Sequence, residues 1–170
     1  DEFFMVRVAS LKAQVEAGIT KKSIDGLTPK EQLTKINKEV KKLTTLQENY
    51  VNNELNNELK EKGVILKKYK DLSENQKNWC NNFFTSSIFP LLTPLVVDPA
   101  HPFPFISNLS LNLAALIKDE EDSKNQFVRV KIPTKNINRF IQIPNEIIQH
   151  SDESSHVFIS VEDLIGNNIN

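Results

Sequence analysis

The 170-residue sequence has few of the residues that build several common kinds of site. Cys80 is the single cysteine, which excludes an internal disulfide and fits a reducing compartment. The four glycines do not cluster, so there is no Walker or dinucleotide glycine loop to hold a phosphate. His101, His150 and His156 stand apart from Cys80 and from one another, without metal-ligand spacing. The residues alone therefore predict neither a metal centre nor a self-contained catalytic site.

The charge and hydropathy patterns exclude two further classes of protein. The chain carries 21 basic and 22 acidic side chains, so no strong overall field would recruit nucleic acid or an anionic membrane. No apolar run reaches the roughly 18 residues that a bilayer-spanning helix needs. The first residues, Asp1-Glu2-Phe3-Phe4, lack an initiator methionine and the order of a signal peptide, so we expect a piece of a longer protein.

The first third of the chain has the periodicity of helices. Apolar residues spaced by three and four predict a helix over residues 1–17 that ends near Gly18. Thr28-Pro29-Lys30-Glu31 forms a capping box and opens a helix of about 34 residues, roughly 50 Å long, that ends at Gly63. The apolar face of this long helix needs a partner, and the first helix covers only part of it. The positions of that face are Leu33, Ile36, Val40, Leu43, Gln47, Tyr50, Val51, Leu55 and Leu59.

A proline-rich stretch, residues 89–112, divides the rest of the chain. It contains five of the eight prolines, at positions 90, 94, 99, 102 and 104, interleaved with phenylalanine, leucine and valine. Proline fixes φ and removes a backbone donor, so this segment should be neither a helix nor a central strand. It is also too apolar for a flexible linker, so we expect a stiff, extended connector pressed against a core.

The remaining segments predict a mixed domain. Residues 64–66 read as a strand, and Ser73-Glu74-Asn75-Gln76 is a capping box that opens a helix. Alternating residues 109–117 and 126–132 predict an antiparallel hairpin, followed by strands at 140–144 and 156–159 and a helix capped by Ser160. The predicted fold class is α+β, with part of a helical bundle at residues 1–62 and an α/β portion with a mainly antiparallel sheet at residues 63–170.

Two residues are candidates for contact with a phosphate. Arg7 lies beside the apolar face of the first helix, where its guanidinium could bind a phosphate or carboxylate, although a salt bridge with Glu2 or Glu31 is the preferred interpretation. His101 could contact a phosphate or accept a phosphoryl group when oriented by Asp98. A loop histidine that fixes a turn is the preferred alternative, because catalysis also needs a pocket.

Two other groups have structural interpretations that we prefer. The lysines of the long helix, Lys35, Lys38, Lys41 and Lys42, could bind a polyanion, but interleaved acidic residues favour a solvated face. Trp79, Phe83 and Phe84 could stack on a base, but their helical spacing is typical of a core.

Four stretches together resemble bacterial polyphosphate kinases of the long, multidomain type. The most specific is residues 98–113, DPAHPFPFISNLSLNL. The others are DEFFMVRVA at residues 1–9, DGLTPKEQL at residues 25–33, and FVRVKIP at residues 127–133 with Arg139-Phe140. The resemblance covers essentially the whole chain and implies the end of an N-terminal helical domain followed by part of a head domain.

The resemblance also implies a function. Such kinases reversibly transfer the terminal phosphate of ATP to polyphosphate through a phosphohistidine, with Mg²⁺, and the nucleophilic histidine has no counterpart among His101, His150 and His156. We expect no catalytic residue and no metal ligand in this chain, with Arg7 near the pocket for ATP or ADP. Homo-oligomer contacts through the head domain and a cytoplasmic location are also implied, with membrane association of the parent enzyme left open.

Two alternatives to this role remain. The chain could be a non-enzymatic interaction module that binds a partner along its long helix. It could also be a polyanion-binding module, whose affinity would fall steeply with salt, but its nearly balanced charge argues against this.

Overall fold

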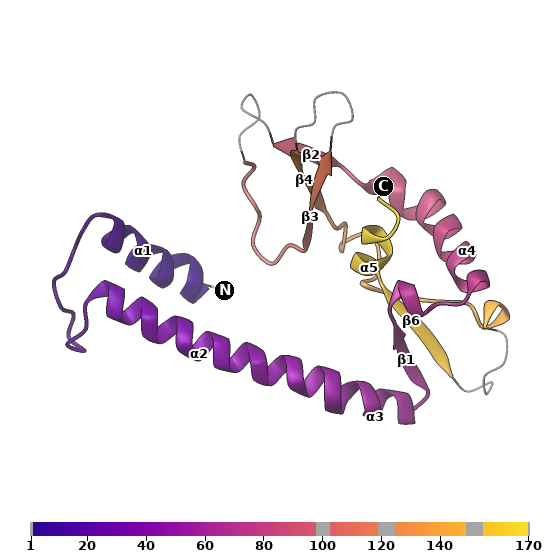
Figure 1. Ribbon diagram of the computed structural model, residues 1–170, viewed down its shortest axis with the longest axis horizontal. Coiled ribbons are helices and arrows are strands. Elements are labelled where there is room, and N and C mark those ends of the chain that lie inside the picture. The colour runs from indigo at the N-terminus through magenta and orange to yellow at the C-terminus, as the bar shows by residue number, and fades with distance from the viewer. Residues whose placement is uncertain (1, 98–102, 119–124, 149–154, 170) are drawn as a thin grey trace. The chain divides into compact units, whose positions relative to one another are not determined.

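The computed structural model describes residues 2–97, 103–118, 125–148 and 155–169 (Figure 1). The chain divides into two compact units, Asp1–Asn57 and Glu58–Asn170. None of the helices in the described ranges is both long and apolar enough to cross a membrane.

The first unit is a pair of helices that pack side by side (Figure 1). The first of them starts as a π-helical segment, Phe3–Val8, and continues as α1, Ala9–Glu16. It ends at Gly18, whose φ of +70° lies in the left-handed region that suits glycine. The predicted helix and its glycine terminus are confirmed.

The second helix of this unit is the longest element of the protein. It runs through α2, Pro29–Tyr50, a π-helical segment, Val51–Leu55, and the start of α3, Asn56–Glu61, whose last four residues belong to the second unit. At its start the Thr28 hydroxyl accepts a hydrogen bond from the backbone N–H of Glu31, and the Glu31 carboxylate accepts one from the N–H of Thr28. The predicted capping box is therefore present, and the helix ends before Gly63, where φ is +77°.

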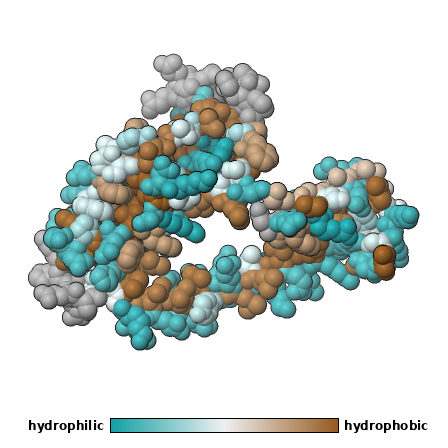
Figure 2. Space-filling view, turned by 180° about the vertical axis from the view of Figure 1, so that it is seen from behind, coloured by the Kyte–Doolittle hydropathy of each residue, from teal (hydrophilic) through white to brown (hydrophobic). Residues whose placement is uncertain are grey.

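The two helices bury only part of their apolar surface against each other. Val8 and Leu11 are buried on the first helix, whereas Leu43 and Leu46 on α2 are 62% and 57% exposed. Figure 2 shows hydrophobic residues along the surface of the long helix. Beyond its first three turns, the predicted packing face of α2 thus has no partner within the described residues of its own unit.

The second unit contains two three-stranded sheets. In the first sheet β6, His156–Ser160, lies between β1, Val64–Lys67, to which it is parallel, and β5, Phe140–Gln142, to which it is antiparallel. In the second sheet β4, Asn125–Lys131, is the centre of an antiparallel set with β2, Pro94–Val97, and β3, Asn112–Lys118. The mainly antiparallel α+β character is confirmed, while the parallel β1–β6 pair was not predicted.

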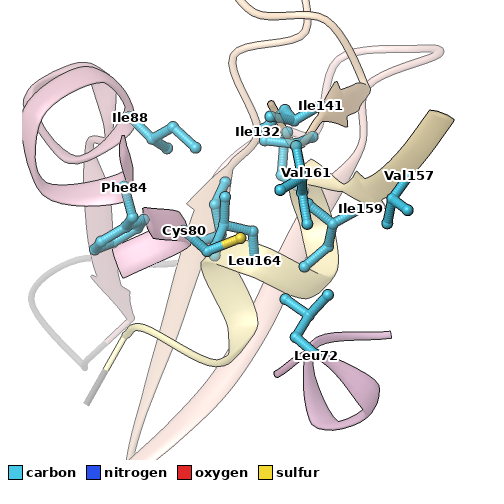
Figure 3. Close-up of a cluster of buried hydrophobic side chains, with 12 residues drawn as sticks. Leu72, Cys80, Phe84, Ile88, Ile132, Ile141, Val157, Ile159, Val161 and Leu164 are labelled. Carbon is cyan, nitrogen blue, oxygen red and sulfur yellow. The ribbon is translucent and has the colours of Figure 1, made fainter. Parts of the chain in front are cut away.

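A hydrophobic core joins the helices of the second unit to its sheets (Figure 3). The helix α4, Glu74–Phe83, begins at the predicted Ser73–Gln76 capping box and continues through helical turns to Leu91. The short α5, Val161–Gly166, is capped by Ser160, as expected. Short 3-10 segments lie at Tyr69–Asp71 and Asn145–Ile147. The buried core consists of Leu72, Cys80, Phe84, Ile88, Ile132, Ile141, Ile143, Val157, Ile159, Val161, Leu164 and Ile165.

The proline-rich stretch follows the prediction in its backbone and only partly in its packing. Pro90 lies in a 3-10 turn, Phe89–Leu91, and Pro94 begins β2, an edge strand. Both positions tolerate a missing N–H, and the described residues of the stretch form neither an α-helix nor a central strand, as predicted. The expected packing against a core holds for part of the described stretch, since Leu92 and Leu111 pack on the core whereas Phe105 is 87% exposed.

The hairpin that follows is present but begins later than predicted. Asn112 rather than Leu109 starts β3, because Leu109 has a φ of 53° and cannot extend the strand. The register pairs Asn112 with Lys131 and Ala114 with Arg129. The side chains of Arg129 and Lys131, two residues apart, therefore share one face of β4.

Candidate functional site

The guanidinium of Arg7 is held in place by an amide from the neighbouring helix. Arg7 is exposed on the π-helical segment that precedes α1, and it donates a hydrogen bond of 2.8 Å to Oε1 of Gln32 on α2. Gln32 is only 7% exposed. A buried amide fixes the arginine in position, and because the amide is neutral the guanidinium keeps its positive charge for a ligand.

The loop between the helices holds Gln32 in turn. Its Nε2 donates to the Ser23 hydroxyl and, at 3.4 Å, to the carbonyl of Leu27. Ser23 also donates to Asp25, whose Oδ1 accepts a 3.1 Å hydrogen bond from the N–H of Leu27. The Ser23 hydroxyl and the Leu27 N–H lower the pKa of the Asp25 carboxyl, with a smaller contribution from the charge of Arg7. A continuous polar network therefore links Arg7 to the loop.

The predicted salt bridge of Arg7 with Glu2 or Glu31 is not formed. Arg7 has no carboxylate within ion-pair distance among the described residues, and Glu31 instead accepts from the N–H of Thr28 at 2.8 Å. Gln32 was not among the site residues predicted from the sequence. Its one signal was its spacing, because Gln32 lies four residues before Ile36 and so places a lone amide on the apolar face of α2.

His156 is the one histidine within the described ranges, and its contact is with a neighbouring strand of its own sheet. His156 is exposed at the start of β6, and its Nδ1 lies 3.0 Å from Nε2 of Gln142 on the neighbouring strand. His101, its proposed orienter Asp98, and His150 lie outside the described residues. Within the described ranges no group of three or more His, Cys, Asp or Glu side chains could hold a metal ion.

The three aromatic residues belong to the core, as the preferred interpretation predicted. The rings of Trp79 and Phe83 on α4 stack with centroids 5.2 Å apart and pack against the buried cluster. Phe84, just beyond α4, is 5% exposed within the cluster (Figure 3). The lysines of α2 are all exposed, and Lys42 lies 3.9 Å from Glu39. The aromatic residues therefore belong to the core and the lysines to a solvated helix face, as we preferred from the sequence.

A cleft of about 410 Å³, lined by both polar and apolar residues, lies where β3 begins and β4 ends. Lys131 projects from the end of β4, and its Nζ donates to the Ser107 hydroxyl at 3.2 Å. Lys135 and Ser110 also line the cleft. These residues could not be predicted from the sequence, because lysine and serine separated by some twenty positions form no local pattern.

The two parts of the sequence match two domains of one family. Residues 1–67 match the polyphosphate kinase N-terminal domain, and residues 75–170 match the polyphosphate kinase middle domain. These two matches follow one another along almost the whole chain.

Individual relatives agree with this assignment. The chain is 51% identical over 169 residues to a polyphosphate kinase of Prochlorococcus marinus, covering 99% of this chain and 24% of the relative. It is 42% identical over 171 residues to a polyphosphate kinase of Synechocystis, covering 99% of this chain and 23% of the relative. The chain thus spans about a quarter of the length of these relatives.

A solved structure has the same fold. The crystal structure of a polyphosphate kinase from Porphyromonas gingivalis matches with a TM-score of 0.75 at 24% sequence identity, covering 99% of this chain and 24% of that chain. At this identity the likeness supports the fold. The two domain matches carry the assignment: this chain belongs to the polyphosphate kinase family.

Proposed function

We propose that this chain is part of an ATP–polyphosphate phosphotransferase, which reversibly transfers the terminal phosphate of ATP to polyphosphate through a phosphohistidine. The observation that carries the proposal is the succession of an N-terminal and a middle polyphosphate kinase domain along the chain. In this proposal the chain frames the nucleotide pocket and makes homodimer contacts through its second unit, in the cytoplasm. The nucleophilic histidine lies elsewhere in the enzyme.

Arg7 is the residue we propose at the nucleotide pocket. Phosphoryl transfer depends on positioning and on neutralising the charge of the phosphate oxygens. A guanidinium with a neutral partner can supply both, because its charge is not cancelled and its remaining N–H groups can donate. Gln32 then acts as a positioning residue. In this proposal Mg²⁺ acts in the parent enzyme, and we propose no residue of this chain as its ligand.

The test measures ATP-dependent polyphosphate synthesis by the full-length protein and by the 170-residue chain. We expect activity in the full-length protein alone. Activity in the isolated chain would overturn our placement of the nucleophile and make His101 the first residue to replace. A full-length protein that makes no polyphosphate from ATP, and no ATP from polyphosphate, would overturn the proposed function.

A second experiment tests Arg7 itself. Replacing Arg7 with Gln should raise the KM for ATP by about tenfold or more, because one charge-assisted hydrogen bond to a phosphate is lost. The matched control is Lys12→Gln, which removes one exposed positive charge from α1. Equal effects of the two variants would contradict a specific role for Arg7.

The alternative function is a non-enzymatic module that binds a partner along the long helix. The observation in its favour is the exposed apolar face of α2, where Tyr50 and Val51 are 46% and 36% exposed in addition to Leu43 and Leu46. This alternative predicts that Leu43→Glu and Leu46→Glu abolish partner capture in a protein without kinase activity. Kinase activity in the full-length protein would reject it.

A further inference from the structure

The cleft beside β3 and β4 has positively charged side chains in its lining, with no acidic side chain among the described lining residues to balance them. Lys131 and Lys135 contribute two ammonium groups, and Ser107, Ser110 and Thr134 contribute hydroxyls. None of the described residues that line the cleft is acidic. Its volume of about 410 Å³ lies in the range of small-molecule sites. The chemistry of this lining suits an anion with several acceptor oxygens.

A chain of hydrogen bonds connects the cleft to a third positive charge. Lys131 donates to the Ser107 hydroxyl at 3.2 Å, and Ser110 donates to the carbonyl of Ser107. Asn112 donates through Nδ2 to the Ser110 hydroxyl at 2.9 Å. Its Oδ1 accepts a 2.9 Å hydrogen bond from Nε of Arg129. The serines and Asn112 thus place the two cations of β4 around one polar network.

Arg129 is the unusual member of this network. It is only 7% exposed, and among the described residues no carboxylate lies within ion-pair distance of its guanidinium. A buried charge is normally paired, because a neutral amide compensates only part of the lost hydration. Arg129 and Lys131 also share one face of β4 and therefore repel each other. A bound anion would lower the free energy of both groups.

We infer that this cleft, defined by Ser107, Ser110, Lys131 and Lys135 with Arg129 behind them, is a binding site for a phosphoanhydride chain. Lys131 and Arg129 are joined by one network, and Lys135 lines the same cleft as Lys131. This arrangement matches a multiply charged, extended anion better than a single phosphate. The ligand is either inorganic polyphosphate or the triphosphate of a nucleotide. Its natural identity rests on the proposed function, whereas the existence of the site rests on the residues described above.

The first test follows individual lysines in the full-length protein. Acetylation by a small reagent, read by mass spectrometry, is compared with and without tripolyphosphate. We expect severalfold protection of Lys131 and Lys135 and none of Lys118, which lies at the other end of β3. Equal protection of all three lysines, or of none, would overturn the inference.

The second test measures binding by calorimetry. Lys131→Gln should weaken one class of tripolyphosphate sites by about tenfold to a hundredfold, the effect of losing a charged hydrogen bond. Lys131→Arg should retain most of the affinity, and Lys118→Gln is the matched loss of charge on the same sheet. Affinity should also fall as salt rises from about 50 to 200 mM. Unchanged binding in Lys131→Gln would contradict the site.

Competition with ATP identifies the source of the phosphate chain. If ATP displaces tripolyphosphate from the site and AMP does not, the site takes the nucleotide triphosphate; if neither does, it takes inorganic polyphosphate. The inference and the proposed function can fail separately. Normal polyphosphate synthesis without lysine protection would reject the site alone, whereas protection in a protein without synthesis would reject the function alone.

Discussion

The single cysteine offers a quantitative test of the core packing in the second unit. Cys80 has no accessible surface, and its burial raises the pKa of the thiol from 9.0 to about 11. At about pH 8, a pKa two units higher leaves about 100-fold less thiolate, the species that reacts with alkylating reagents. The reagent must also reach the sulfur, so alkylation has to await an opening of the core.

The size of the expected effect follows from the free energy of that opening. An opening that costs about 4 kcal/mol populates the reactive form to roughly one part in a thousand. We therefore expect iodoacetamide to modify Cys80 at least about 1000-fold more slowly than a free thiol. The rate should rise with pH only to about pH 9, because the opened form has an ordinary pKa. If Cys80 instead reacted within the folded core, the rate of modification would keep rising to about pH 11.

The assay is mass spectrometry of the alkylated protein over time at several pH values. The control is a Cys80→Ala, Ser86→Cys variant, since Ser86 is exposed just beyond α4. Modification of Cys80 within tenfold of the rate of this control, under native conditions, would refute the packing described for the core.

Three further predictions concern helix ends. Thr28→Ala should lower the free energy of unfolding by about 1 kcal/mol in urea melts followed by circular dichroism, because it removes the N-cap of α2, whereas Thr34→Ala within the helix should not destabilise. The hydrogen bond from the Thr28 N–H lowers the pKa of Glu31 below 4.5, so its stabilising contribution is full at neutral pH and disappears as the pH falls through the folded pKa. The stability gap between the parent protein and Glu31→Gln should therefore narrow between pH 7 and pH 3, and a constant gap would contradict the capping role. Gly63→Ala should cost about 1–2 kcal/mol because φ is +77°, while Gly166→Ala, at a position with open space and no positive φ, should be neutral or stabilising.

The features predicted correctly from the sequence are those that depend on neighbours along the chain. Thr28 and Glu31, like Ser73 and Gln76, are three residues apart, so the hydroxyl and the carboxylate or amide meet whenever a helix begins there. The hairpin strands followed from alternation for the same reason. The proline-rich stretch shows the limit of such local information, because proline restricts only its own φ and the backbone of its predecessor. It could not tell us that Pro94 would lie on a sheet edge.

The candidate sites were less predictable. Arg7 could be selected from its place on the helix, but its partner Gln32 is 25 residues away and depends on how the two helices pack. The network from Lys131 to Arg129 likewise requires the register of β3 against β4, which brings Asn112 opposite Lys131. Neither the packing of the two helices nor the register of the two strands can be predicted from a sequence pattern.

The parallel pairing of β1 with β6 has a consequence for the order of folding during synthesis. It joins residues about 90 positions apart, with β6 at the centre of its sheet. Contacts so distant in sequence form slowly and only after both partners have left the ribosome. The helices α1 and α2 can pair early from local contacts, whereas the first sheet must wait for nearly the last residues of this chain. Until then β1 and the apolar face of α4 remain exposed, which makes this interval the time of greatest need for chaperone protection.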